Sequence, residues 1–273
     1  MNDLESTFLN EENFYMAFKK LNHYLKQSNE WYNPVELASF EANLSTNLSI
    51  IRTALKEGTY QPNAIEPLPF PKKSDSEGNG RIRQYFKISI SDQIVWIAIT
   101  NTIGVFLEPR MPSWSYGNRL FVPTWFEEQE GRLKIERGAL RNSSANYYRK
   151  WNQSWPLYRR HMSMTIKIMA LNRSFKSDTL ETDIEREIYE SEQDNNFLDN
   201  PFLNADYWKK GKRKELFWAG LDYEKFFPSI NPEKIIAIIR TSIVRENGAQ
   251  RDDTQVLFDT IDKMFRFPID LSG

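Results

Sequence analysis

An apolar run that ends in a carboxylate has the clearest chemical potential in this sequence. Residues 216–221 read Leu-Phe-Trp-Ala-Gly-Leu, Asp222 follows, and Phe226 and Phe227 come shortly after it. A strand would present Asp222 on a rigid element, and carboxylate oxygens suit Mg²⁺ that is shared with substrate phosphates, as two-metal phosphoryl transfer requires. An isolated aspartate at the end of a strand also caps ordinary turns. The run alone leaves both interpretations open.

Composition excludes several classes of protein. The chain has 273 residues and no cysteine, and its only histidines are His23 and His161, so disulfides, cysteine-ligated metals, cysteine nucleophiles and histidine metal clusters are excluded. With 40% hydrophobic and 14% aromatic residues, wholesale disorder is excluded too. No window approaches the roughly 18 apolar residues of a membrane span, and the acidic start lacks a secretory signal. We therefore expect a soluble, cytoplasmic protein.

The near-neutral net charge of −1 hides two opposed blocks. Residues 132–173 carry ten basic side chains and one acidic side chain, interleaved with tryptophans and tyrosines, whereas residues 178–206 carry ten acidic side chains and one basic. Basic residues among aromatics suit a groove that follows a phosphate backbone and stacks bases. A solvated amphipathic helix with core aromatics explains the basic block equally well. The acidic block fits either a solvated insertion or a shield for the basic face.

Periodicity and turn residues predict the elements that would position these side chains. We predict helices over residues 11–27, 33–57, 91–107, 231 onward and 253–267. Ser91 and Asp92 should cap the third of these helices, and Ile235, Ile238 and Ile239 should lie on one face of the fourth. Residues 162–171 fit strand or helix, and helix is favoured. Gly58 should end the second helix, and residues 216–222 should form a strand.

A hairpin is predicted after the second helix. Four prolines exclude helix from residues 59–71, and the polar residues 72–80 contain Gly78 and Gly80. We therefore expect residues 66–71 and 81–88 to be extended segments joined by a tip at 72–80.

Four segments resemble reverse transcriptases, in the order of that family. Residues 216–230 resemble motif A, in which an apolar strand, a metal-binding aspartate and an aromatic pair precede Ser-Ile. Gly-Thr-Tyr-Gln-Pro at 58–62, Arg83 followed nine positions later by Asp92-Gln-Ile-Val, and Ser-Tyr-Gly-Asn-Arg at 115–119 resemble fingers elements. The resemblance covers residues 33–239 with a long insertion between 119 and 216, and it is greatest to the bacterial abortive-infection, defence-associated branch.

This resemblance implies roles for individual residues near the active centre. Asp222, with the Tyr223 carbonyl, would bind the catalytic Mg²⁺, or Mn²⁺ in its place. Phe227 would be the sugar gate that rejects a 2′-hydroxyl, although core packing is its alternative role. Arg83, with Lys72 or Lys73, would contact the incoming triphosphate; a solvated hairpin is the alternative for the lysines.

The resemblance and the basic block together imply a nucleic-acid path. Residues 115–119 would shape the junction of fingers and palm, with Ser115 and Arg119 along the template. The basic residues predicted to contact nucleic acid in the insertion are Arg149, Lys150, Arg159 and Arg160.

One departure from the family pattern limits the activity we expect. The family's Tyr/Phe-x-Asp-Asp hairpin does not follow motif A, and Asp252-Asp253 lies in a polar turn before a helical pattern, as a cap would. One carboxylate cannot hold two metals. We therefore expect this chain to contain the fingers and part of the palm, and to be inactive alone.

Together these points predict an α+β fold of the right-hand polymerase type. Residues 1–58 would form a helical N-terminal region, 59–119 the fingers, 120–215 an atypical insertion and 216–273 the first part of the palm. The complete protein would be an RNA-directed DNA polymerase, a nucleotidyltransferase of antiviral defence. Its partners would be an RNA template or associated non-coding RNA, deoxynucleoside triphosphates, the DNA product and, as an option, a second copy of the chain, with no membrane involved. Template-independent, protein-primed DNA synthesis and a non-catalytic RNA-binding module are the alternatives.

Overall fold

The computed structural model contains two compact units. It describes residues 4–28, 31–73, 78, 80–112, 114–121, 124–129, 132–137, 145–149, 151–171, 219–220, 230–247 and 254–269. Unit 1 comprises Met1–Leu107, Ala145–Tyr147 and Asn231–Gly273, and unit 2 comprises Glu108–Ser144 and Tyr148–Ile230. Unit 1 therefore joins distant parts of the sequence, because its N-terminal helices share one apolar core with its C-terminal helices.

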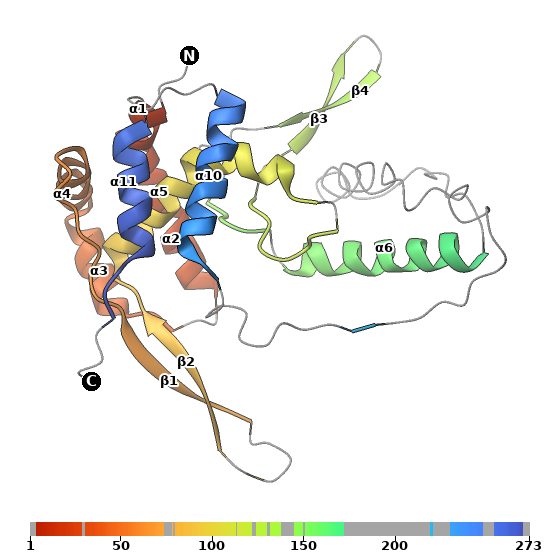
Figure 1. Ribbon diagram of the computed structural model, residues 1–273, viewed down its shortest axis with the longest axis horizontal. Helices are drawn as coiled ribbons and strands as arrows, with labels where there is room; N and C mark the ends of the chain where they lie inside the picture. The colour runs from red at the N-terminus through yellow and green to blue at the C-terminus, as the bar shows by residue number, and fades with distance from the viewer. Residues whose placement is uncertain are drawn as a thin grey trace. The chain divides into compact units, whose positions relative to one another are not determined.

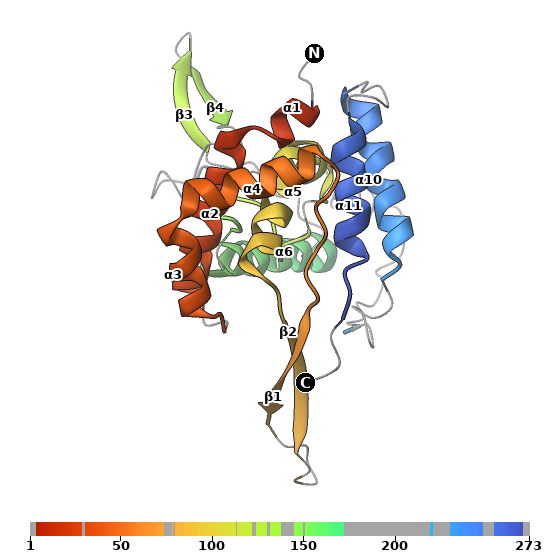
Figure 2. The ribbon, with the colours of Figure 1, turned by 90° about the vertical axis from the view of Figure 1, so that its left-hand side faces the viewer.

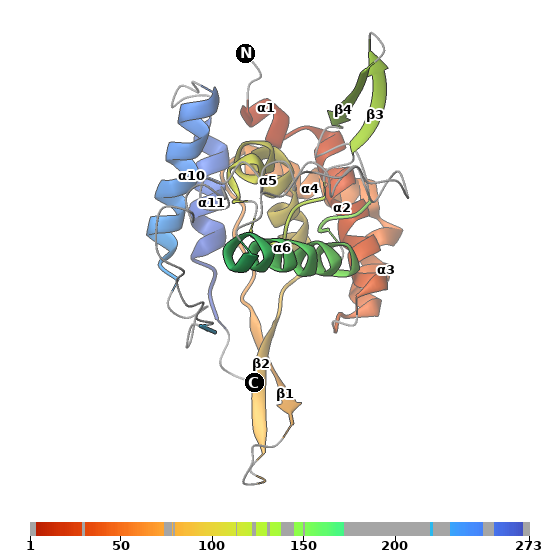
Figure 3. The same ribbon diagram turned by 90° about the vertical axis from the view of Figure 1, so that its right-hand side faces the viewer.

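Helix α5 is the central element of unit 1. The described helices of this unit are α1 (Leu4–Phe8), α2 (Glu11–Gln27), α3 (Pro34–Ala42), α4 (Leu44–Lys56), α5 (Ile90–Leu107), α10 (Pro232–Asn247) and α11 (Gln255–Phe265). α5 contacts α1, α2, α3, α10 and α11, and α10 lies beside α11 (Figures 1 and 3). Among the described residues, Ile90–Arg110 alone is long and apolar enough to cross a membrane, but 61% of its apolar window is buried. Such burial is typical of the core helix of a soluble protein.

Helix α2 occupies the predicted residues because its cap and its apolar stripe agree. The side chain of Asn10 accepts a hydrogen bond from the Glu12 amide at 2.9 Å, which satisfies a free N–H group of the first turn. Phe14, Phe18 and Leu21 are buried at helical spacing and face the core.

The single helix predicted over residues 33–57 is wrong, because the structure has two helices that meet at Asn43. The Asn43 backbone has φ −124° and ψ 37°, outside the helical region. The Phe40 carbonyl accepts hydrogen bonds from the Asn43 amide at 3.3 Å and from the Asn47 side chain at 3.0 Å. A side-chain amide thus competes with the regular helical bond. The predicted end at Gly58 is confirmed, since its φ of +70° favours glycine.

The predicted cap of α5 is also wrong. The helix begins at Ile90, so Ser91 and Asp92 lie inside it. Ser89 is the cap: its Oγ accepts the Asp92 amide at 3.1 Å, as an N-cap bonds the third helical residue.

The predicted hairpin is confirmed. Strand β1 (Glu66–Lys72) pairs antiparallel with β2 (Arg81–Lys87), and the hairpin projects from the helices of unit 1 (Figures 1 and 2). Pro67, Pro69 and Pro71 occupy alternate positions of β1. Proline has no N–H group to donate. Because the prolines occupy every second position, the residues between them can still make their hydrogen bonds to β2, and the outer edge of β1 cannot pair with a further strand.

The predicted cap of α10 is confirmed, and the predicted face is confirmed for Ile235 and Ile239 but wrong for Ile238. The Asn231 side chain accepts the Lys234 amide at 3.0 Å. Ile236, Ile239 and Ile243 are buried, whereas Ile238 is 63% exposed. With 3.6 residues per turn, Ile236, Ile239 and Ile243 lie on one side of the helix, and this side packs against the core of unit 1. Helix α11 begins two residues later than predicted and ends before Pro268.

The described residues of unit 2 form a short 3₁₀ helix, a hairpin and one long helix. The 3₁₀ helix is Glu108–Arg110, strands β3 (Thr124–Gln129) and β4 (Arg132–Arg137) pair antiparallel, and α6 is Trp151–Leu171. Residues 162–171 are therefore helical, as favoured. The predicted strand at 216–222 lies outside the described residues. The polymerase architecture and its domain limits at residues 58, 119 and 215 remain predictions.

Candidate functional site

The register of the β1–β2 hairpin places the predicted triphosphate contacts on one face. Phe70 pairs with Arg83, and Lys72 pairs with Arg81. Side chains alternate between the two faces of a strand, so paired residues and every second neighbour share a face. Lys72, Phe70 and Arg83 therefore lie together, with Tyr85 next along β2. Lys73 follows the end of β1 and is exposed.

A groove with a volume of about 360 Å³ lies along this face. Its lining includes Phe70, Lys72, Arg83 and Tyr85, with Trp31 from the segment before α3. The Phe70 and Tyr85 rings meet edge to face at 5.1 Å between centroids, and Arg83 Nη1 donates to the Tyr85 hydroxyl at 3.3 Å. The described lining contains two cations and no carboxylate. The groove therefore combines positive charge with exposed aromatic rings, which suits a phosphate joined to a base.

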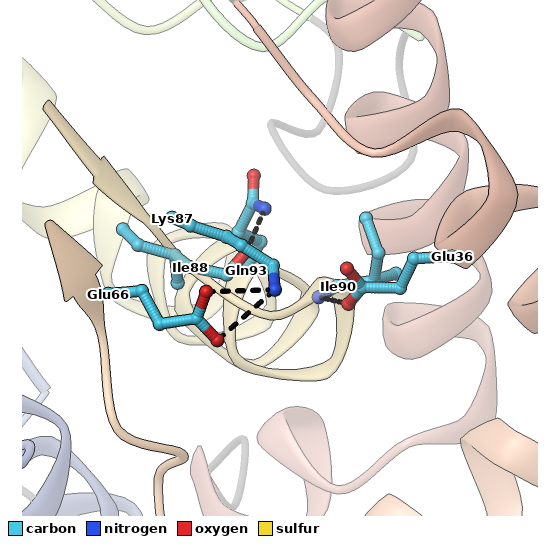
Figure 4. A network of polar contacts seen from close by, with 6 residues as sticks. All are labelled: Glu36, Glu66, Lys87, Ile88, Ile90 and Gln93. Atoms are coloured by element: carbon cyan, nitrogen blue, oxygen red, sulfur yellow. Dashed lines mark hydrogen bonds and ion pairs between the residues drawn. The ribbon is translucent and has the colours of Figure 1, made fainter. Parts of the chain in front are cut away.

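Three polar contacts lie around the base of the hairpin, one between its two strands and two at the start of α5 (Figure 4). Lys87 Nζ contacts both Glu66 carboxylate oxygens at 3.2 and 3.1 Å across the two strands. Gln93 Nε2 donates to the Ile88 carbonyl at 2.8 Å, and the Ile90 amide donates to Glu36 at 2.9 Å. The last bond satisfies a free N–H at the start of α5. The ion pair thus holds the two strands together, and the segment after β2 is bonded to α5, which is bonded in turn to α3.

Asp92 is a buried hydrogen-bond centre beneath the hairpin. The residue is 3% exposed, and its carboxylate accepts the Tyr60 hydroxyl at 2.6 Å, the Ser89 hydroxyl at 2.6 Å, and the Asn63 amide and side chain at 3.0 Å each. Burial, and then the Asp92 charge, raises the pKa of Tyr60, which keeps this hydroxyl protonated as a donor. Asp92 therefore joins residues 58–62 to the start of α5. These are two of the family-like segments, and the contact between them was not predicted from the sequence.

The turn at residues 115–119 is held internally by its own arginine. Arg119 Nε donates to Glu108 Oε1 in an ion pair whose side chains are 11% and 13% exposed. Arg119 Nη1 also donates to the Pro112 and Ser115 carbonyls at 3.4 and 3.3 Å, and the Leu120 amide donates to Glu108 at 3.1 Å. Asn118 has a φ of 53°, a left-handed conformation that asparagine tolerates. The guanidinium of Arg119 thus organises the turn, and Ser115 supplies one of its acceptors.

Tyr116 connects this turn to helix α6. Its hydroxyl lies 2.6 Å from His161 Nδ1. Burial, with the Arg160 charge second, lowers the pKa of His161 to about 4, while burial and Tyr158 raise the pKa of Tyr116. Both groups are therefore neutral at pH 7, and the Tyr116 hydroxyl and the imidazole share one hydrogen bond.

The predicted nucleic-acid contacts in unit 2 lie on neighbouring segments. Arg149 precedes α6, its amide donates to the Arg119 carbonyl at 2.9 Å, and Arg159 and Arg160 lie on the helix, with Arg159 exposed. Lys150 lies outside the described residues. Trp155 and Tyr158 are three residues apart on α6, a spacing that places both on one face of a helix. From the sequence they were counted among the aromatic residues of the basic block, and this spacing was not used.

The residues predicted for catalysis, Asp222, Tyr223 and Phe227, lie outside the described residues. Within the described ranges, no group of three or more His, Cys, Asp or Glu side chains could hold a metal ion. The resemblance to reverse transcriptases therefore rests on the four sequence segments, two of which are joined by the Tyr60–Asp92 hydrogen bond. Comparisons with protein-family models, curated proteins and solved structures find no match for this chain.

Proposed function

We propose that this chain is the nucleotide-binding portion of an RNA-directed DNA polymerase of bacterial antiviral defence. The observation that carries the proposal is the hairpin face, where Lys72 and Arg83 share a groove with Phe70 and Tyr85 and no carboxylate opposes them in the described lining. An exposed cation pair of this kind suits a triphosphate, and the planar guanidinium can bond two phosphate oxygens at once.

The proposed roles follow the chemistry of nucleotide addition. The 3′-hydroxyl oxygen of the growing strand attacks the α-phosphorus of a deoxynucleoside triphosphate, and the bond to pyrophosphate breaks. Arg83 and Lys72 orient the phosphates and offset their charge. Lys73 adds a cation at the end of the strand. Phe227 is proposed to exclude a 2′-hydroxyl.

Asp222 and the Tyr223 carbonyl are the proposed ligands for Mg²⁺ or Mn²⁺, which would neutralise phosphate charge and activate the attacking oxygen when bound. Hard oxygen donors suit either ion.

Two experiments test this proposal. Binding of a deoxynucleoside triphosphate to the chain should weaken roughly 10-fold or more in Arg83→Ala, because a charge-assisted contact is lost. Lys56→Ala, which removes an exposed cation at the end of α4, is the matched control and should bind normally. In the complete polymerase, Asp222→Ala should abolish incorporation of deoxynucleotides, and unchanged incorporation would remove Asp222 from the mechanism.

A non-catalytic RNA-binding module is the second candidate, and the basic and aromatic surface of unit 2 favours it. Such a module would bind RNA with an affinity that falls steeply with salt. It would show no binding of deoxynucleoside triphosphates that depends on Arg83. Template-independent synthesis primed from a protein hydroxyl stays a variant of the main proposal, distinguished by incorporation that survives omission of the template.

A further inference from the structure

A second hollow lies within unit 2, away from the hairpin in sequence and built from different residues. Its volume is about 500 Å³, within the usual range of small-ligand pockets. The turn at 115–119 contributes Tyr116, and the segment from Arg149 into the first turns of α6 contributes Ser154, Trp155 and Tyr158.

Three aromatic rings form one wall of this pocket. Trp155 and Tyr158 stack at 5.3 Å with an interplanar angle of 30°, and Tyr116 meets Tyr158 edge to face at 5.4 Å. The hydrogen bond to the buried His161 fixes Tyr116 from behind. Trp155 remains 51% exposed, so the stack offers an indole face to a flat ligand. A fixed aromatic platform with one open face suits a nucleobase.

The polar groups of the pocket favour an anion beside that platform. Helix α6 has 21 residues and no acidic residue in its first turn, so its N-terminal dipole end is not offset by a local carboxylate. Ser154 is 7% exposed, and within the described part of the chain its Oγ has no hydrogen-bond partner. A buried hydroxyl without a partner destabilises a fold, and a ligand that bonds it would remove the penalty. Arg149 adds a positive charge to the lining.

We propose that this pocket binds one unpaired nucleotide, with its base stacked on Trp155 and its phosphate beside Arg149, Ser154 and the start of α6. The nucleotide belongs either to a single strand of nucleic acid or to a free nucleoside monophosphate. The inference deepens the proposed function, on whose nucleic-acid binding it rests. It assigns the contact to Tyr116, Ser154, Trp155 and Tyr158, and it leaves Arg119 as a structural residue of the turn.

A cationic ligand held in an aromatic cage is the competing occupant. Aromatic rings do attract quaternary ammonium groups. The Arg149 guanidinium and the positive end of α6 would repel such a ligand, and the described lining provides no carboxylate to offset them. The charges therefore favour the nucleotide.

Binding of a fluorescein-labelled, unstructured oligonucleotide of about 12 nucleotides to the whole chain tests the pocket directly, a length within the usual site size of single-strand binders. Trp155→Ala should lower the affinity roughly 10-fold, because one base loses its stacking partner, and Trp155→Phe should restore most of it. Trp114→Ala is the matched control, since Trp114 is also in unit 2 and 58% exposed but does not line the pocket. Equal affinities for Trp155→Ala and Trp114→Ala would overturn the proposal.

Ser154→Ala tests the proposed contact independently, because a residue with only a structural role would lower stability when substituted and would not lower affinity alone. Its affinity for the oligonucleotide should fall roughly threefold as a hydrogen bond is lost, while its midpoint of thermal unfolding should not fall. Unchanged affinity in this variant would remove Ser154 from the site.

Two competitors identify the occupant. Displacement of the oligonucleotide by adenosine monophosphate indicates that a free nucleotide suffices, and displacement only by an unlabelled strand indicates a strand. Displacement by a trimethyllysine peptide would overturn the proposal in favour of a cation cage. Failure of the proposed polymerase function would appear separately, as triphosphate binding that is insensitive to Arg83→Ala.

Discussion

The hairpin face of unit 1 and the aromatic pocket of unit 2 both expose aromatic rings, but they use arginine and carboxylate side chains differently. On the hairpin, the arginine is exposed and the buried anion Asp92 organises the fold beneath it. In unit 2, Arg119 is largely buried against Glu108, and Trp155 is the exposed ring of the aromatic pocket. The two arginines of family-like segments therefore differ: Arg119 holds its own turn together, whereas Arg83 is exposed, as its proposed contact with a triphosphate requires. Burial and partners decide between these roles, and residue type does not.

Loss of the Asp92 carboxylate should destabilise unit 1 strongly. Asp92→Ala leaves the hydroxyls of Tyr60 and Ser89 and the Asn63 side chain without their acceptor, so the free energy of unfolding should fall by about 3 to 5 kcal/mol. Asp92→Asn, which keeps the shape and part of the bonding, should cost less. Urea unfolding followed by circular dichroism measures both, and a loss below about 1 kcal/mol for the alanine variant would contradict the structural role.

The corresponding change in unit 2 should be somewhat smaller. Arg119→Ala leaves Glu108 charged and partly buried, so unit 2 should lose about 3 kcal/mol of stability. The paired variant Glu108→Gln with Arg119→Met removes both charges and should recover part of that loss. Limited proteolysis of unit 2 and denaturant unfolding follow the effect. If Arg119→Ala were fully stable but bound nucleic acid weakly, Arg119 would be a ligand contact after all.

The two regions also differ in how far their groups could be predicted from sequence. The hairpin was predictable because prolines exclude helix and glycines mark its tip, and period-two alternation then brings Lys72 and Arg83 to one face. The Asp92 centre was not predictable, because Tyr60 and Asn63 reach it through tertiary packing and not through a spacing in the chain.

The pocket of unit 2 was only partly predictable. The spacing of Trp155 and Tyr158 indicates a shared face of a helix. The contact between Tyr158 and Tyr116 joins separate segments, so no spacing in the sequence predicts it.

The break between α3 and α4 at Asn43 was not predictable either, because it involves one side-chain amide, that of Asn47, which bonds the Phe40 carbonyl.

A pH dependence should distinguish unit 2 from unit 1. The pKa of His161 is about 4 in the folded chain, below its unfolded value of 6.5, so the unfolded state binds the proton more readily. The stability is therefore full above pH 6.5 and is lost as the pH falls toward 4, by about 3 kcal/mol. Thermal unfolding of the chain and of His161→Gln across this range gives the difference. Parallel curves for the two proteins would contradict the assignment.

Substitution of Ser154 should change the free energy of unfolding least, and the sign of the change shows whether its hydroxyl is bonded within the fold. Ser154→Ala removes a buried hydroxyl without a described partner and gains helix propensity, so it should stabilise unit 2 by about 1 kcal/mol. Denaturant unfolding measures the change. Destabilisation by a similar amount would mean that the hydroxyl is bonded in the folded chain.

Photo-crosslinking with an azido-substituted deoxynucleoside triphosphate, followed by peptide mass spectrometry, shows where on the chain the nucleotide binds. We expect the label to fall on residues 66–87 and unlabelled triphosphate to compete for it. Arg83→Ala should greatly reduce the labelling, whereas Lys56→Ala should not. A label that spares this hairpin, or that forms equally in the two variants, would contradict the account.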